Sequence, residues 1–278
     1  ERGERVGLVG ESGCGKSTLT RAILGLEPTK AGEITLGGVP VFAGKNPNLD
    51  VRRRMQVVFQ DPYSSFNPRH RVGRLISEPF HLLKASVLGA ARLAAICRAL
   101  EEVGLSAGDR DKYIHEFSGG QRQRVVIARA LTLKPELIIA DEPVSALDVS
   151  IQAQVLNLFK ELQDEMELTY IFVAHDLGVV RHISDRIAVM YLGKIVELGS
   201  VEEIYNNPQH PYTRGLIACR PTLEKSPHRL PTVSDFMTED GREKAFDQSI
   251  LKIENLFTLI FSLFKKRYCG FSISQCCG

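Results

Sequence analysis

The sequence predicts an α/β domain built on a mainly parallel β-sheet, and three observations support this fold class. Short apolar runs that are typical of buried strands alternate along the chain with longer segments of helical pattern. The first apolar run, at residues 6–9, leads directly into a glycine-rich loop and then into a helix. A later run, at residues 137–140, ends on two acidic residues, which places them at the carboxyl edge of the sheet.

The predicted elements alternate from residue 6 to residue 198. Strands are expected at residues 6–9, 55–60, 137–140, 170–174, 187–191 and 194–198, with a small hairpin at 33–41. Helices are expected at residues 16–26, 121–133 and 150–165, and a helical subdomain is inserted at about residues 72–125.

The chain divides into one large domain and a C-terminal part of different character. Residues 1–220 hold all of these strands and helices, so we expect them to form the domain. Residues 221–249 are polar, contain prolines and show no sustained period, which predicts a linker or a poorly structured extension. Residues 250–278 form a separate tail.

The composition is that of an ordinary globular protein. The chain has 278 residues, of which 44% are hydrophobic and 24% charged, and its formal net charge is only +2. So small a net charge creates no general basic field, and we expect no nucleic-acid partner. The six cysteines are too few and too scattered for a disulfide framework, which indicates a reducing, cytosolic environment.

The stretch GESGCGKS, residues 10–17, fits the pattern G-x-x-x-x-G-K-[ST] in full and predicts a phosphate-binding loop for ATP. Glycines let successive backbone N–H groups surround the phosphates, and the helix that starts near Lys16 directs its positive end at them. Lys16 adds a charge at the β- and γ-phosphates, and the Ser17 hydroxyl is a ligand for Mg²⁺. The expected nucleotide-binding residues are Gly10, Ser12, Gly13, Cys14, Gly15, Lys16, Ser17 and Thr18.

The stretch LIIADEP supplies two acids for the same site. Asp141 and Glu142 follow a buried strand, so both carboxylates reach the edge of the sheet where the loop lies. There Asp141 can reach Mg²⁺ through water, and Glu142 can orient or activate the attacking water.

The stretch FSGGQRQRVVIARAL narrows the class of protein. Ser118, Gly119, Gly120 and Gln121 stand at the start of a strong helix, whose N-terminus is a second anion site. One chain that binds one ATP does not need two such sites, whereas two facing chains do if each completes the site of the other. The motif resembles the SGGQ signature of ABC-type ATPases, and the resemblance covers roughly residues 1–220.

Three further motifs occur in the order of that family. Gln60 resembles the Q-loop glutamine, a ligand of the metal that also contacts the membrane partner. The SALD stretch, which ends at Asp148, resembles the D-loop that crosses the dimer interface. His175 resembles the switch histidine, which contacts the γ-phosphate. The resemblance therefore implies an ATP-hydrolysing enzyme with Mg²⁺ as cofactor and with Glu142 and His175 as catalytic residues.

Two longer stretches indicate a subfamily. VFQDPYSSFNPRHRVG and NPQHPYTRGL, which includes residues 210–213, resemble segments of the dipeptide, oligopeptide, nickel and glutathione import ATPases. This resemblance implies a peripheral subunit at the cytoplasmic face of the cell membrane that drives peptide uptake, with nickel uptake as the alternative. The implied partners are a second ABC ATPase domain, transmembrane permease subunits and, indirectly, an extracytoplasmic solute-binding protein.

Two other classes of P-loop protein fit the sequence less well. A GTPase would show an N-K-x-D motif, which is absent. ABC proteins of DNA repair carry a very long coiled-coil insertion, whereas only 57 residues separate Gln60 from Ser118.

The family's opening strand, with an aromatic residue that stacks on adenine, is expected well before the phosphate loop. Residues 1–9 contain no aromatic residue, so we expect the first strands of the domain to be missing and ATP binding to be weakened. A fragment that binds ATP with little or no hydrolysis is therefore an alternative. Residues 251–267 resemble the family's opening and could begin a second ATPase domain, form a permuted first strand or result from a broken reading frame.

Overall fold

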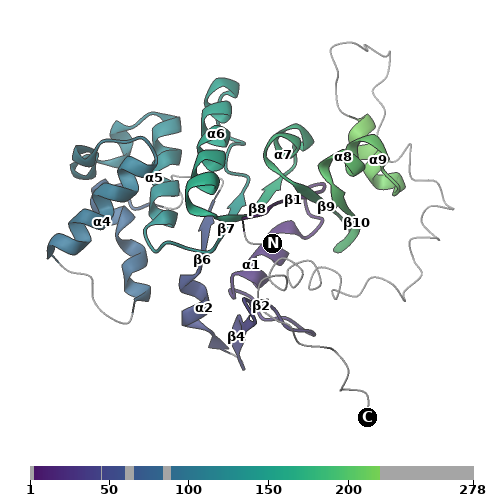
Figure 1. The fold of residues 1–278 in the computed structure, drawn as a ribbon, viewed down its shortest axis with the longest axis horizontal. Helices are drawn as coiled ribbons and strands as arrows, with labels where there is room; N and C mark the ends of the chain where they lie inside the picture. Colours follow the sequence, from purple (N-terminus) through teal and green to yellow (C-terminus); the bar gives the residue numbers. More distant parts are fainter. Residues whose placement is uncertain (1–2, 45, 60–65, 84–88, 220–278) are drawn as a thin grey trace.

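The structure, a computed structural model, describes residues 3–44, 46–59, 66–83 and 89–219. Gln60 and the expected linker and tail, residues 221–249 and 250–278, lie outside these ranges. Within them the chain forms an α/β domain with a mainly parallel central sheet, as the sequence predicts (Figure 1).

In the described residues, the main sheet has six strands in the order β10-β9-β1-β8-β7-β6. Neighbouring strands are parallel except for β10, which pairs antiparallel with β9 at one edge. β1 therefore lies inside the sheet, between β8 and β9, which places the loop that follows it near the middle of the carboxyl edge. The strands are β1 Arg5–Val9, β6 Met55–Val58, β7 Leu137–Asp141, β8 Thr169–Ala174, β9 Arg186–Tyr191 and β10 Lys194–Ser200.

Two hydrophobic cores cover the two faces of this sheet. The larger core contains buried residues of α5 (Gly119–Leu131), α6 (Val149–Met166) and α7 (Leu177–Ile183). The smaller core packs α1 (Lys16–Ile23) and α2 (Leu49–Arg53) against the opposite face. Two small hairpins also lie on that side, β2 Thr35–Leu36 with β3 Val39–Pro40 and β4 Phe42–Ala43 with β5 Asn46–Pro47. The sequence predicts the first hairpin but not the second.

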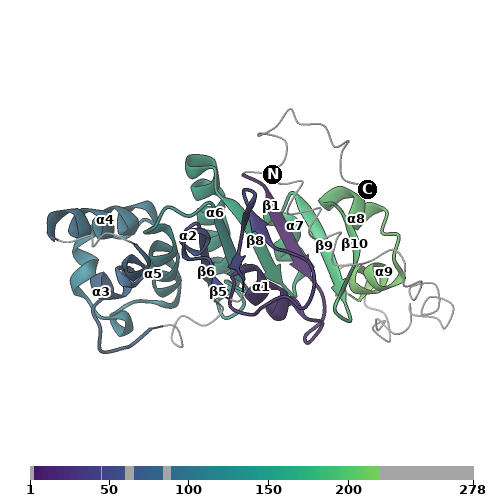
Figure 2. The ribbon, with the colours of Figure 1, turned by 90° about the horizontal axis from the view of Figure 1, so that it is seen from below.

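The predicted helical subdomain forms a lobe beside the sheet (Figure 2). Its helical segments are shorter than the sequence pattern suggests: α3 Val72–Ile76, the 3₁₀ turn η1 Glu78–Leu82 and α4 Gly89–Glu102. Pro79 stands near the start of η1, and a proline is tolerated in a first helical turn but not in a helix interior. The lobe continues through the 3₁₀ turns η2 Ala107–Asp111 and η3 Ile114–Glu116 into α5.

The last described elements, α8 Val201–Asn206 and α9 Pro211–Ala218, lie beside β9 and β10. His210 caps α9, because its Nδ1 accepts the Tyr212 N–H at 3.1 Å, and Pro211 occupies the first turn. No helix in the described part of the chain combines the length and the apolar character needed to cross a bilayer.

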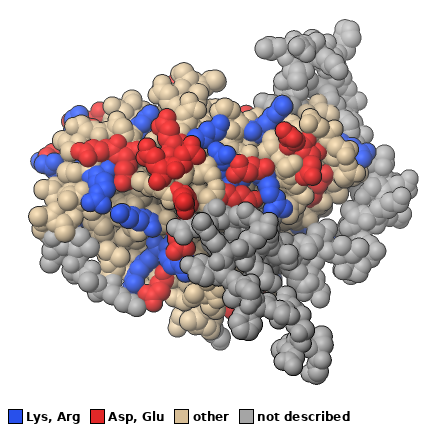
Figure 3. Space-filling model, in the orientation of Figure 1, with Lys and Arg blue, Asp and Glu red and all other residues tan. Residues whose placement is uncertain are grey.

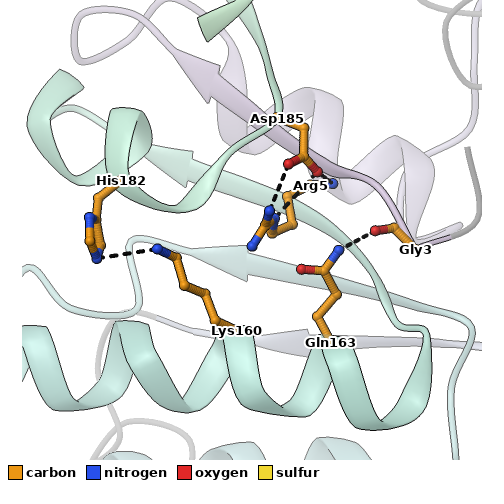
Figure 4. A network of polar contacts seen from close by, with 6 residues as sticks. All are labelled: Gly3, Arg5, Lys160, Gln163, His182 and Asp185. Carbon is orange, nitrogen blue, oxygen red and sulfur yellow. Dashed lines mark hydrogen bonds and ion pairs between the residues drawn. The ribbon is translucent and has the colours of Figure 1, made fainter.

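Polar contacts fix the start of β1 from both sides (Figure 4). The Arg5 guanidinium donates to both carboxylate oxygens of Asp185, at 3.3 and 2.7 Å, and the Arg5 N–H donates to the same carboxylate at 2.9 Å. From α6, the Gln163 amide donates to the Gly3 carbonyl. β1 is thereby attached to both the α6 layer and the segment that enters β9.

Phe159 of α6 is the centre of an aromatic cluster under the sheet. It is fully buried and meets Tyr170 and Phe172 edge-on at centroid distances of 5.4 and 5.7 Å. We expect Phe159→Ala to lower the free energy of unfolding by about 3–5 kcal/mol, because it removes these contacts and leaves a cavity. Urea denaturation measures the loss. Leu93→Ala, at an exposed position of α4, is the control and should change the value by less than about 0.5 kcal/mol. Equal losses of unfolding free energy in the two variants would show that Phe159 is not the centre of the aromatic cluster.

Candidate nucleotide site

The phosphate loop connects β1 to α1 and depends on two glycines. A Cβ at Gly10 would lie 2.2 Å from the Met190 carbonyl oxygen of β9, so only glycine allows this close approach. Gly15 precedes α1 with a left-handed φ of 105°. α1 begins at Lys16, as the sequence predicts, and the N–H groups of a first helical turn have no partner within the helix.

Lys16 is almost fully buried, at 7% exposure, although it carries a positive charge. Its Nζ donates hydrogen bonds to two carbonyl oxygens of its own loop, that of Gly10 at 2.7 Å and that of Glu11 at 2.9 Å. These carbonyls replace part of the hydration that a buried ammonium loses.

Asp141 and Glu142 reach the same edge of the sheet at the end of β7. Burial raises the pKa of Asp141, the Glu142 carboxylate raises it further, and the positive charge of Lys16 opposes both effects. Lys16 and Asp141 are thus close enough for their charges to interact, as their predicted shared site requires. Carboxylate and hydroxyl oxygens are the ligands that Mg²⁺ prefers, so Asp141 and Ser17 are suitable donors for it.

Glu142 and His175 are brought together because they follow two adjacent parallel strands. The His175 Nδ1 lies 3.3 Å from a carboxylate oxygen of Glu142. Glu142 has a left-handed φ of 49°, which is unusual for a residue other than glycine. Its N–H donates to the Val173 carbonyl of β8 at 2.9 Å, and its carbonyl accepts from the Ser145 hydroxyl at 3.0 Å. These bonds fix the backbone of Glu142, from which the carboxylate extends to His175.

The predicted signature residues form the N-terminus of α5. Ser118 is exposed, and its hydroxyl accepts the Gln121 N–H at 3.4 Å, while the Gln121 side chain accepts the Ser118 N–H at 3.0 Å. This reciprocal pair is a capping box, which leaves the inner N–H groups of the helix start available for an anion.

The signature and the predicted D-loop lie side by side. A Cβ at Gly120 would lie 2.7 Å from the Ile151 side chain in the first turn of α6, the helix that begins after Asp148. A Cβ at Gly119 would meet Leu147 at 3.6 Å. The sequence does not predict these contacts, which join the signature to the D-loop and the start of α6. The predicted metal ligand Gln60, by contrast, lies outside the described residues.

The loop also has two contacts with residues far along the chain, which no local sequence pattern predicts. The Gly193 N–H, in the turn between β9 and β10, donates to the Cys14 carbonyl at 2.9 Å. The hydroxyl of Tyr212 in α9 accepts the Glu11 N–H at 2.9 Å. Tyr212 belongs to the HPYT segment, but its 201-residue separation from Glu11 hides the contact from any reading of local pattern.

Comparison with known proteins agrees with this geometry. The family model described as "ABC transporter" matches residues 1–145, more than half of the chain. The chain belongs to the ABC transporter family. A second model, "Oligopeptide/dipeptide transporter, C-terminal region", matches residues 196–241, which include β10, α8 and α9. The ABC transporter chain is therefore an ATP-binding subunit with ATPase activity, as the sequence predicts.

Among curated proteins, this chain is similar to ATP-binding proteins of peptide transport. The oligopeptide transport ATP-binding protein OppF of Bacillus subtilis (strain 168) is 54% identical over 262 residues, which cover 94% of this chain and 83% of OppF. The dipeptide transport ATP-binding protein DppF of Escherichia coli (strain K12) is 48% identical over 230 residues, which cover 82% of this chain and 69% of DppF.

Two solved structures share the ABC fold. CbiO1 from Clostridium perfringens, described as part of an ABC transporter complex, matches with a TM-score of 0.67 and 28% identity. The match covers 78% of this chain and 84% of CbiO1. The ATP-binding cassette MJ0796, a dimer bound to ADP and phosphate, matches with a TM-score of 0.61 and 28% identity, over 72% of this chain and 87% of MJ0796.

The raised pKa of Asp141 means that its ionised form weakens the nucleotide-free fold. The penalty is absent below the ordinary aspartate pKa of 3.8 and develops as pH rises through the higher folded value. At pH 7 we therefore expect Asp141→Asn to raise the melting temperature, by an amount that shrinks towards pH 4.

Thermal unfolding of the nucleotide-free chain at several pH values measures this effect. Asp164→Asn, at an exposed position of α6, is the control and should leave the melting temperature unchanged. A lower melting temperature for Asp141→Asn at pH 7 would show that the carboxylate is stabilising there.

Proposed function

We propose that this chain is the ATP-hydrolysing subunit of an ABC importer for oligopeptides or dipeptides. The observation that carries the proposal is that Lys16, Asp141, Glu142 and His175 converge on one edge of the sheet at the N-terminus of α1. The printed names of OppF and DppF and the C-terminal region match support the peptide class of solute.

In this proposal the loop residues Gly10, Ser12, Gly13, Cys14, Gly15, Lys16, Ser17 and Thr18 bind the phosphates of ATP. Lys16 offsets negative charge that develops on the phosphoryl oxygens during transfer. Ser17, Asp141 and Gln60 would hold Mg²⁺, which supplies charge neutralisation at the β- and γ-phosphates. Glu142 orients and deprotonates the attacking water, and His175 steadies the γ-phosphate.

A second ABC ATPase domain is the proposed partner at the exposed signature. Ser118, Gly119, Gly120 and Gln121 would bind the γ-phosphate of the ATP held by that domain, and Asp148 would lie at the interface. Val149 beside it is 82% exposed, which is unusual for a large apolar side chain and suits burial by a partner. The dimer formed by MJ0796 supports this arrangement.

The remaining partners follow from the importer proposal. The chain would sit at the cytoplasmic face of the cell membrane against transmembrane permease subunits, with an extracytoplasmic solute-binding protein acting through them. Closure of the two ATPase domains on ATP would move the permease, and hydrolysis would reopen the dimer.

Glu142→Gln tests the catalytic assignment in the complete transporter. We expect the variant to bind ATP but to hydrolyse it at least about 100-fold more slowly, because an amide cannot accept the proton of the attacking water. ATP binding and phosphate release are measured on the same preparation. Glu161→Gln, at an exposed position of α6, is the control and should turn over normally. Near-normal hydrolysis by Glu142→Gln would remove Glu142 from the mechanism.

Uptake assays test the class of solute. With the transporter in vesicles, we expect labelled di- and oligopeptides to be taken up and to raise ATP hydrolysis severalfold, whereas Ni²⁺ does neither. The Lys16→Ala variant should abolish both responses, because it removes the charge at the phosphates. Stimulation by Ni²⁺ and not by peptides would replace the proposed solute while leaving the ATPase assignment intact.

A further inference from the structure

A single peptide unit links Tyr212 to Lys16. The N–H of Glu11 and the carbonyl of Gly10 belong to the same peptide bond. The N–H donates to the Tyr212 hydroxyl at 2.9 Å, and the carbonyl accepts from the Lys16 Nζ at 2.7 Å. Because a peptide unit is planar and resists twisting, an atom that fixes one end of this plane also fixes the direction of the other.

Tyr212 is itself held rigidly. Its side chain is fully buried, and its ring packs on that of Tyr191 in β9 with centroids 4.3 Å apart. Burial raises its pKa to about 12, so the hydroxyl stays neutral and accepts the N–H across the physiological range. A neutral, fixed acceptor is suited to hold a peptide plane in one orientation.

The HPYT segment is attached to the sheet by a charged group. The Glu197 carboxylate of β10 accepts the N–H groups of Gln209 and His210, at 2.7 and 3.0 Å, just before α9 begins. His210 then caps the helix at the Tyr212 N–H. Each step from β10 to the Tyr212 hydroxyl is therefore fixed by a hydrogen bond or by ring packing.

We propose that Tyr212 is a positioning residue for ATP, which acts through the Gly10–Glu11 peptide to place the ammonium of Lys16. The inference rests on the proposed role of Lys16 at the phosphates. It assigns to the C-terminal region a part in nucleotide binding, which Tyr212 exerts through its bond to the Glu11 N–H. The ring alone fills space and packs on Tyr191; the hydroxyl carries the positioning function.

Tyr212→Phe separates these two parts, because it removes the hydroxyl and keeps the ring. We expect the affinity of the full chain for ATP, measured by equilibrium titration, to fall about three- to tenfold, since one hydrogen bond to the loop is lost. Tyr191→Phe is the matched control: it keeps the stacked pair and removes a hydroxyl that does not bond to Glu11, and ATP affinity should be unchanged.

A double-mutant cycle with Lys16→Arg gives a result that a purely structural role cannot produce. Arginine keeps the charge but cannot repeat the compact pair of bonds that the ammonium makes. If Tyr212 acts through Lys16, Tyr212→Phe should weaken ATP binding less than twofold in the Lys16→Arg background. The melting temperatures of the four nucleotide-free proteins are recorded alongside.

The outcomes distinguish this inference from the proposed function. An unchanged ATP affinity for Tyr212→Phe would overturn the positioning role, and so would an equal loss in both backgrounds. If Lys16→Arg itself binds ATP as tightly as the unaltered chain, the exact placement of the positive charge is unimportant and the positioning role fails. If Lys16→Ala keeps its uptake and ATPase responses, the role of Lys16 in the proposed function fails instead. A fall in melting temperature without a fall in ATP affinity would reduce Tyr212 to a packing residue.

Discussion

The nucleotide site depends on how the chain accommodates one buried positive charge. Lys16 begins the helix that follows the loop after interior strand β1, and carbonyl groups of that loop accept hydrogen bonds from its ammonium. This requires the loop to curl back on itself, which in turn requires glycine where the backbone passes within contact of β9. The buried positive charge of Lys16 must be stabilised by nearby polar groups. The strand order, the glycine spacing and the acids that follow β7 all contribute to this.

Much of this arrangement could be predicted because its causes are local. β1, β7 and β8 are short apolar runs buried on both faces, so composition alone identifies them, and the residues that follow them necessarily meet at one edge. The strand pattern locates Asp141 and Glu142 in this way, whereas the role of His175 is implied by its resemblance to the switch histidine of ABC-type ATPases. The phosphate loop can also be predicted from the sequence, because the spacing of its glycines and lysine is set by the geometry of phosphate binding.

Other features cannot be predicted from the sequence, because they depend on residues far apart in the chain or give only a weak sequence pattern. The second hairpin has two-residue strands that give no periodic signal. The helical pattern after residue 72 predicts a longer helix, whereas the structure divides it into α3 and the 3₁₀ turn η1, with Pro79 in the first turn of η1. Gly120 reads as part of a signature, whereas its packing on Ile151 depends on how two helices cross. The HPYT segment marks a subfamily in the sequence, whereas the contact between its tyrosine and the phosphate loop depends on the fold.

The Glu11–Tyr212 contact also has a consequence for the order in which the molecule is made. Synthesis proceeds from the N-terminus, and the phosphate loop leaves the ribosome about two hundred residues before α9 does. Until α9 docks, a nascent chain holds a loop that lacks one of its supports. Contacts between such distant segments form late, because a long loop must close first. Completion of the nucleotide pocket thus coincides with the closing stage of folding, when nearly the whole domain is already assembled.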